Sequence, residues 1–168
     1  DQEWPSAVVL EDDALPMAEK FNGLNELLTQ LPPDWDLLYL GLRGNRRAPL
    51  LFPLRCYLYH PLVRLFLPKK YRLTVAETSR LYLRPFSKRL YRAGYHQGSH
   101  AYAISAKGAR AILKHTPKII APADVILATL VIEGKLNAFA VKEDLCTTTG
   151  QASQIVSELV KGGDGSVT

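Results

Sequence analysis

Cysteine is scarce in this sequence, with two residues among 168, Cys56 and Cys146. They lie ninety positions apart and have no CxxC or Cys/His companions. The pattern therefore indicates neither a disulfide framework nor a structural zinc site, and it suits a reducing compartment.

Long apolar runs are missing as well. The most apolar stretch, residues 119–132, is interrupted by Pro122 and Asp124. It is shorter than the about 20 apolar residues that a membrane-spanning helix needs. The first residues, DQEWP, lack the basic and apolar regions of a signal peptide, and no initiator Met precedes them. We expect no transmembrane helix, a cytoplasmic location and a missing N-terminal part.

Acidic residues are nearly absent from residues 43–92, which hold thirteen Lys or Arg and one acid, Glu77. The rest of the chain holds eight bases and fifteen acids, so the net charge of +5 hides one basic segment. Its five prolines and scattered Leu and Tyr predict an irregular insertion, which we place at residues 43–95.

Three interpretations of this insertion are open. It could lie on an anionic membrane leaflet, at the inner face of the membrane, because basic and apolar residues are mixed along it. It could instead bind phosphate groups of an acceptor; nucleic acid is not expected, because no recognised motif is present. The third interpretation is a solvated insertion whose apolar residues pack on the domain.

Outside the insertion, strand and helix patterns alternate, which predicts an α/β fold. The apolar runs predict strands at 7–10, 36–41, 98–105 and 136–141, the first of them buried and followed by a polar loop. Helical spacing predicts helices at 17–31, 106–115 and 124–133, the second with Ser105 as its N-cap. We expect one domain over residues 1–160 and a flexible tail at 161–168.

Three consecutive carboxylates, Glu11, Asp12 and Asp13, follow the first predicted strand. Like charges at such short distances repel unless a cation or hydrogen bonds compensate them. Hard oxygen ligands suit Mg²⁺ or Mn²⁺, and such an ion can bridge a diphosphate and neutralise a departing nucleotide. A solvated acidic loop, or a capping cluster ahead of the 17–31 helix, is the alternative.

Four sequence blocks resemble, in order, the landmarks of glycosyltransferase family 25, which includes bacterial lipopolysaccharide and lipooligosaccharide galactosyltransferases. The blocks are VLEDDA at 9–14, WDLLYLG at 35–41, GSHAYAIS at 98–105 with Gly108-Ala109, and PAD at 122–124. The resemblance runs from about residue 8 to residue 157, with a long central departure. Members of this family normally begin with a further strand-and-helix region that helps to form the donor pocket.

The resemblance implies a GT-A-type fold, here partial, with a mixed sheet flanked by helices. It also implies an inverting, Mn²⁺-assisted transfer of a sugar, galactose above all, from a UDP-sugar donor to a lipopolysaccharide or other glycan acceptor. The acidic triplet would hold the ion and the donor diphosphate. Because strand side chains alternate, Glu11 and Asp13 are the expected metal ligands rather than Asp12.

An inverting transfer needs a base near the acceptor hydroxyl. Asp124 is the first candidate, although an N-cap role is the ordinary interpretation of an acid at a helix start. His100 is the second candidate, and it could also be a hydrogen-bonded structural histidine. Tyr39 and Tyr102 are interpreted as core residues of strands.

Two rival functions stay open at this point. The chain could be a non-catalytic acceptor-binding or membrane-binding module left from a truncated transferase. It could also be a metal-dependent phosphotransferase or nuclease, which would share the acidic cluster, although no P-loop is present.

Overall fold

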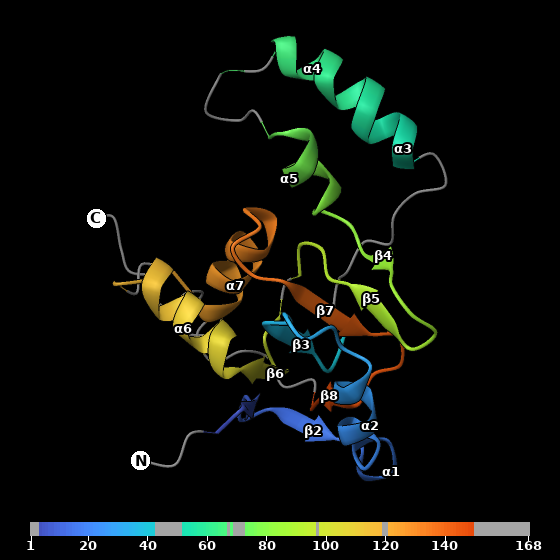
Figure 1. Ribbon diagram of the computed structural model, residues 1–168, viewed down its shortest axis with the longest axis vertical. Helices are drawn as coiled ribbons and strands as arrows, with labels where there is room; N and C mark the ends of the chain where they lie inside the picture. The colour runs from blue at the N-terminus through green and yellow to red at the C-terminus, as the bar shows by residue number, and fades with distance from the viewer. Residues whose placement is uncertain are drawn as a thin grey trace, which may run out of the picture.

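The computed structural model describes residues 4–42, 52–66, 68, 73–96, 98–118 and 121–149 of the chain. They form a six-stranded mixed sheet and a two-stranded one, flanked by helices, so the predicted α/β fold is confirmed (Figure 1). The main sheet has the spatial order β1 (Ser6–Leu10), β6 (Ala101–Ser105), β3 (Leu37–Tyr39), β7 (Ala138–Val141), β5 (Leu90–Arg92) and β4 (Arg84–Pro85). Only the β3 and β7 pair is parallel.

Helices cover both faces of this sheet because its central strands are apolar on both sides. Leu37 and Tyr39 point toward α6 (Ala106–His115) and α7 (Ala123–Ile132), and together they form one core cluster. Leu38 and Leu40 pack in a second cluster, against α2 (Leu24–Thr29). The alternation places β3 at the centre of both cores.

Both long helices were predicted from their spacing. The Ser105 hydroxyl caps α6 by accepting a 2.9 Å hydrogen bond from the Gly108 amide, as expected of an N-cap. The helix α7 ends at Ile132, and Gly134 follows its C-cap residue Glu133 with a φ of 73°, which suits glycine. Pro122, not Asp124, is the N-cap of α7, and it makes no side-chain capping bond. The predicted N-cap role of Asp124 is therefore wrong.

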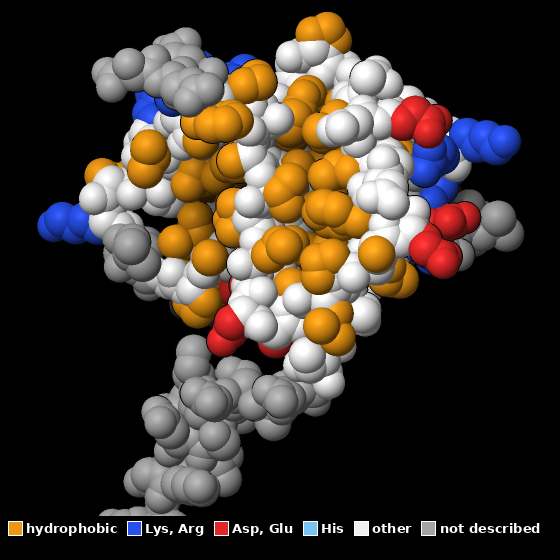
Figure 2. All heavy atoms as spheres, turned by 90° about the horizontal axis from the view of Figure 1, so that it is seen from below, with side chains coloured by type: hydrophobic (Ala, Val, Ile, Leu, Met, Phe, Trp, Pro, Cys, Tyr) orange, Lys and Arg blue, Asp and Glu red, His pale blue; other side chains and the backbone are white. Residues whose placement is uncertain are grey.

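The first strand was expected to be buried, and this is also wrong. β1 pairs with β6 on one side only, so it is an edge of the sheet. Its consecutive residues Val8, Val9 and Leu10 are 40%, 37% and 43% exposed, so apolar side chains reach solvent on both faces of the strand. Figure 2 shows the hydrophobic surface on this side of the molecule. A short apolar run predicts a strand, but it does not say what covers it.

The helix predicted at 17–31 is interrupted. The chain first forms β2 (Ala14–Pro16), which pairs with β8 (Cys146–Thr148) in the small sheet, where a polar loop was expected. Two short helices, α1 (Ala18–Phe21) and α2, follow, separated at Gly23. Glycine destabilises a helix interior, which accounts for the break at Gly23. The apolar spacing continues across this break, so the sequence pattern alone predicts one helix.

The predicted irregular insertion is ordered in part. It supplies β4, β5 and the helix α5 (Val75–Ser79), where Thr74 and Glu77 form a capping box. A helical arm precedes them, formed by α3 (Phe52–Leu54), the π-helical segment η1 (Arg55–Tyr59) and α4 (His60–Phe66). The arm projects from the sheet (Figure 1). Residues 43–51, 67 and 69–72 of the insertion and the 161–168 tail lie outside the described residues.

Candidate functional site

The acidic triplet forms a tight turn between β1 and β2. The Ala14 amide donates a 3.1 Å hydrogen bond to the Glu11 carbonyl, which closes the turn. Strand alternation therefore does not decide where these side chains point, because β1 ends at Leu10. Glu11 and Asp12 are exposed and Asp13 is half-buried. One carboxylate oxygen of Asp13, Oδ1, is buried without a hydrogen-bond partner among the described residues.

Two hydrogen bonds attach this turn to the start of β6. The Glu11 amide donates to the His100 carbonyl at 2.8 Å, and the Ser99 hydroxyl donates to Glu11 Oε1 at 2.5 Å. Ser99 and His100 are 3% and 5% exposed, so the Glu11 carboxylate is held by a buried hydroxyl. A hydroxyl bonded to a carboxylate makes a short, strong hydrogen bond.

The His100 imidazole packs against the carboxyl end of β3. A Cβ atom at Gly41 would overlap with His100 Nε2, so only glycine fits there. His100 Nδ1 is buried and has no hydrogen-bond partner among the described residues. One ring nitrogen of His100 is thus left without a partner within the described residues, and its structural and catalytic interpretations both stay predictions.

His96 and Tyr39 complete the buried part of the site. Their ring centroids are 4.3 Å apart, and each side chain is 1% exposed. Burial lowers the pKa of His96 to about 4, and the neighbouring His100 lowers it as well; hydrogen bonds to the Gly98 and Gly41 backbone raise it. His96 is consequently neutral at pH 7.

Asp124 lies in the first turn of α7, and its charge acts on the same buried group. Burial raises the pKa of the Tyr39 hydroxyl well above its usual range, and Tyr102 and then Asp124 raise it further. The Asp124 charge also raises the pKa of His96, against the effect of burial. Asp124 is half-buried, and its Oδ1 accepts a 2.8 Å hydrogen bond from the Val125 amide. The other carboxylate oxygen accepts no hydrogen bond from the described residues.

The four sequence blocks therefore meet at one end of the sheet. Glu11 is bonded to Ser99 and to the His100 backbone, His100 packs on Gly41, and Asp124 acts on Tyr39. We call this group the carboxyl-end site, because it lies where β3 ends. It has acidic and imidazole side chains, which are the groups that transfer protons.

The acidic triplet is the part of the site that could bind a divalent ion. Among the described residues, no three His, Cys, Asp or Glu side chains gather in a metal-binding arrangement. Mg²⁺ and similar ions are commonly bound through one or two carboxylates, with substrate phosphates and water completing the shell. The unpartnered Asp13 Oδ1 and the neighbouring Glu11 fit that mode, and Asp12 is exposed on the same turn.

Sequence reasoning missed His96, Ser99 and the position of Tyr39 within the site. The signal for His96 was its spacing: it precedes His100 by four residues, with Gly98 between them. Tyr39 was correctly predicted as a core residue, but its hydroxyl is buried with no hydrogen-bond partner among the described residues. A tyrosine at a strand end can therefore belong both to the core and to a site.

The chain was compared with models of protein families, with curated proteins and with solved structures. None of the three comparisons finds a match. The resemblance to glycosyltransferase family 25 thus stays a prediction based on the four blocks. Along the described part of the chain, no helix combines the length and apolarity needed to cross a bilayer.

Proposed function

We propose that this chain is a metal-assisted, inverting glycosyltransferase that uses a UDP-sugar, with UDP-galactose as the expected donor. One observation supports this most strongly. Blocks as far apart in sequence as Glu11, Gly41, His100 and Asp124 come together at the carboxyl-end site. In open α/β sheets, ligands bind in the crevice beyond the carboxyl ends of strands. The proposed acceptor is a lipopolysaccharide or another glycan.

In this proposal Asp124 takes the proton from the acceptor hydroxyl while that oxygen attacks the anomeric carbon. The new glycosidic bond forms as the bond to the diphosphate breaks, and UDP leaves with the electron pair. A neutral His96 suits this role for Asp124, because it provides no permanent cation that would stabilise the carboxylate and weaken it as a base. His100, whose Nδ1 has no partner within the described residues, would orient the acceptor.

Glu11 and Asp13 would hold the divalent ion, Mn²⁺ or Mg²⁺, with Asp12 beside them on the turn. The chemistry supplied by such an ion is neutralisation of the negative charge that develops on the leaving diphosphate. The chain's own contribution is to fix the carboxylates. The Ser99 hydroxyl holds Glu11 Oε1 at 2.5 Å, and the Thr149 amide donates to the Asp13 carbonyl at 3.1 Å.

A donor screen tests this function. The chain is incubated with a panel of UDP-sugars and Mn²⁺, with a lipopolysaccharide core glycan as acceptor, and UDP release and the glycan product are measured. We expect release and product with one UDP-hexose, abolished by a metal chelator. Product formation that is unaffected by the chelator, or no product with any donor, contradicts the proposal.

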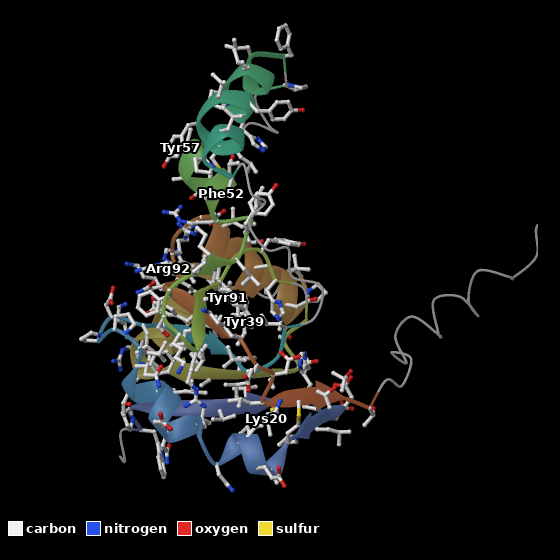
Figure 3. All side chains as sticks on the ribbon, turned by 90° about the vertical axis from the view of Figure 1, so that its right-hand side faces the viewer. Lys20, Tyr39, Phe52, Tyr57, Tyr91 and Arg92 are labelled. Atoms are coloured by element: carbon white, nitrogen blue, oxygen red, sulfur yellow. The ribbon has the colours of Figure 1, made fainter. Side chains whose placement is uncertain are left out.

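A second candidate function is favoured by the arm. Seven of its large apolar side chains are more than half exposed: Leu54, Tyr57, Leu58, Tyr59, Leu62, Leu65 and Phe66, the last at 88%. Figure 3 shows Phe52 and Tyr57 on the arm, far from Lys20 at the opposite end of the molecule. Phe52 packs on Tyr82 with ring centroids 5.7 Å apart, which attaches the base of the arm.

We propose that the arm lies in the interface of an anionic membrane and brings the domain to a lipid-linked acceptor. Exposed Leu, Tyr and Phe are the side chains that insert at the headgroup level. The surrounding segment has thirteen bases and one acid, and each basic residue near an anionic surface contributes about 1 kcal/mol. A non-catalytic module would need only the exposed apolar side chains of the arm and the surrounding basic residues to bind a membrane.

Vesicle sedimentation tests the membrane proposal. We expect binding to vesicles with anionic phosphatidylserine, weaker binding to neutral phosphatidylcholine, and loss of binding in the double variant Leu65→Asp and Phe66→Asp. Leu113→Asp is the control, because Leu113 is 73% exposed on α6, outside the arm. Equal sedimentation with both vesicle types, or none, contradicts the proposal.

A further inference from the structure

Three arginines converge at the end of the sheet opposite the carboxyl-end site. Arg80, Arg84 and Arg92 line a cavity of about 270 Å³ beside Ala138, the first residue of β7. We call this cavity the arginine pocket. Arg80 is the C-cap of α5, and the other two come from β4 and β5. The pocket therefore collects side chains from an element of the insertion and from the sheet edge that the insertion adds.

The three guanidinium groups are close enough to repel one another. Arg84 and Arg92 are direct cross-strand partners in the antiparallel β4 and β5 pair, where like charges destabilise. Burial lowers the pKa of Arg84, and Arg92 and then Arg80 lower it as well. Such an arrangement is stable only when the repulsion is compensated.

The protein compensates this charge incompletely. Arg80 Nη1 donates to the Ile132 carbonyl at 3.2 Å, and Arg92 Nη1 donates to Asn137 Oδ1 at 3.1 Å. Arg84 Nε is buried and has no hydrogen-bond partner among the described residues. Each guanidinium has five N–H donors, so most donors of the three groups have no acceptor within the described residues.

The acid in the pocket lining does not neutralise the arginines. Asp34 is exposed, and its Oδ2 accepts a 3.0 Å hydrogen bond from Asn137 Nδ2. Within the part of the chain that the structure describes, none of the three arginines forms an ion pair with a carboxylate. The pocket lining consequently has three positive charges and one negative charge.

Packing contacts hold two of the three arginines in place. Arg92 lies over the rings of Phe86 and Phe139, 5.4 Å and 5.3 Å from their centroids, which fixes its guanidinium by cation–π contact. Arg80 packs so closely on Gly134 that a Cβ there would come within 2.7 Å of its Cζ. Figure 3 shows Arg92 below the arm. Two of the three arginines are thus held in position before any ligand arrives.

From this geometry we propose that the arginine pocket is a binding site for a phosphoryl group, as the free anion or as a phosphate monoester. Guanidinium groups bind phosphate oxygens through paired N–H donors, and three of them match the three terminal oxygens of a monoester. A bound phosphate supplies the missing acceptor for Arg84 Nε and removes the cross-strand repulsion. The site does not depend on the transferase proposal, because it lies at the other end of β3 and β7.

Titration calorimetry with inorganic phosphate and with glycerol 3-phosphate tests this, in buffer matched for ionic strength with chloride. We expect saturable binding of at least one of the two, weakened about tenfold or more in Arg84→Gln. Arg110→Gln is the matched control, because this substitution removes the same charge from an exposed position on α6. The Arg110→Gln variant should bind both phosphate ligands with the same affinity as the unmodified protein. Absence of binding, or equal loss in both variants, overturns the proposal.

Thermal unfolding gives a second readout that does not require a weakened variant to fold well. Without phosphate, Arg84→Gln should melt at the same temperature as the unmodified protein or a higher one, because one of three repelling charges is removed. With phosphate, the melting temperature of the unmodified protein should rise and that of the variant should not. A variant that is less stable without phosphate and gains the same rise with it overturns the proposal.

The source of the phosphoryl group is distinguished by vesicles. Phosphatidic acid presents a phosphate monoester, whereas phosphatidylserine at matched surface charge does not. If the source is a lipid headgroup, vesicles with phosphatidic acid bind better, and the preference disappears in Arg84→Gln. If the source is a soluble phosphate, the two vesicles bind alike while calorimetry still gives phosphate binding. The proposed site is overturned if Arg84→Gln keeps the preference for phosphatidic acid vesicles and calorimetry detects no phosphate binding.

Discussion

The two ends of the central strands β3 and β7 carry opposite chemistry. At the carboxyl end, Glu11 and Asp124 supply carboxylates and His100 supplies an imidazole that packs on Gly41. At the amino end, Arg84 and Arg92 face each other across two short strands. In the functions that we propose for them, one end accepts protons and holds a cation, and the other holds an anion. Different segments close the two ends, which would let a small sheet carry two sites.

The two ends also differ in how they are held. The carboxyl-end site rests on hydrogen bonds between neighbouring turns, such as Ser99 to Glu11 at 2.5 Å. The amino end is fixed by a network around Asp36, whose Oδ1 receives Lys107 at 2.8 Å and whose Oδ2 receives the Asn137 amide at 2.8 Å. We therefore expect variants at one end to leave the other end unchanged.

The largest expected effect is on sugar transfer. Asp124→Asn should lower the transfer rate by about 10² to 10⁴-fold, because a general base contributes that much. Donor binding and the melting temperature should change little, since the Val125 amide can still donate to the retained oxygen. Asp34→Asn, at the amino end, is the matched control and should keep its activity. Near-normal transfer by Asp124→Asn would remove it as the base.

The next effect is a pH dependence that arises at the carboxyl end. The folded-state pKa of His96 is about 4, below the ordinary value of about 6.5. Between these values the unfolded chain binds a proton that the folded chain does not. The free energy of unfolding should therefore fall by up to roughly 3 kcal/mol as the pH decreases from 6.5 to 4. Above pH 6.5 this contribution is constant.

Urea unfolding across that pH range measures the effect. In His96→Gln the decrease between pH 6.5 and 4 should be smaller than in the unmodified protein, while His115→Gln, at an exposed position, should keep the full slope. The two groups that act on His96 through their charges, His100 and Asp124, remain in both variants. Identical slopes in all three proteins would show that His96 is not buried in its neutral form.

Gly41→Ala tests the packing at the carboxyl end. A Cβ there would overlap with the His100 ring and lie 2.7 Å from the Cys146 carbonyl oxygen. We expect a loss of about 1–3 kcal/mol in the free energy of unfolding, as overpacking costs in a tight site. Gly23→Ala is the control, since the nearest atom to its Cβ is 3.4 Å away. Equal destabilisation of the two variants contradicts this packing.

The smallest effect belongs to the amino end. Ser105→Ala removes the α6 cap and the 3.0 Å hydrogen bond from the Ser105 hydroxyl to the Trp35 carbonyl. The free energy of unfolding should fall by about 1 kcal/mol, with no loss of donor binding per folded molecule. Thr129→Ala, on the exposed side of α7, should change stability less. Unfolding curves in urea give both values, and loss of donor binding in Ser105→Ala would couple the two ends.

The two ends were not equally predictable from sequence. The residues of the carboxyl end lie in compact blocks beside clear strand patterns, so Glu11, His100 and Asp124 could be chosen before the structure. Their contacts could not, because Ser99 and Gly41 meet the others only through pairing between distant strands. The amino end was missed for another reason. Arg84 and Arg92 lie in a proline-rich basic segment, where β4 has two residues and includes Pro85.

A strand this short gives no period to detect, and proline at a sheet edge is read as a break in the pattern. The exposure of β1 was also unpredictable, because an apolar run looks the same at the centre of a sheet and at its edge. The two edges differ accordingly. β4 has Arg84 and Pro85, residues that discourage further pairing, whereas Val8, Val9 and Leu10 of β1 carry no charge.

The central claim is that the carboxyl end binds a nucleotide sugar with a divalent ion. Titration calorimetry of the chain with UDP-galactose, with and without Mn²⁺, tests it most directly. We predict binding that requires Mn²⁺ and weakens about tenfold or more in Asp13→Asn, while Arg84→Gln at the other end binds normally. Donor binding without any dependence on Mn²⁺, unchanged binding by Asp13→Asn, or no binding at all would contradict the account.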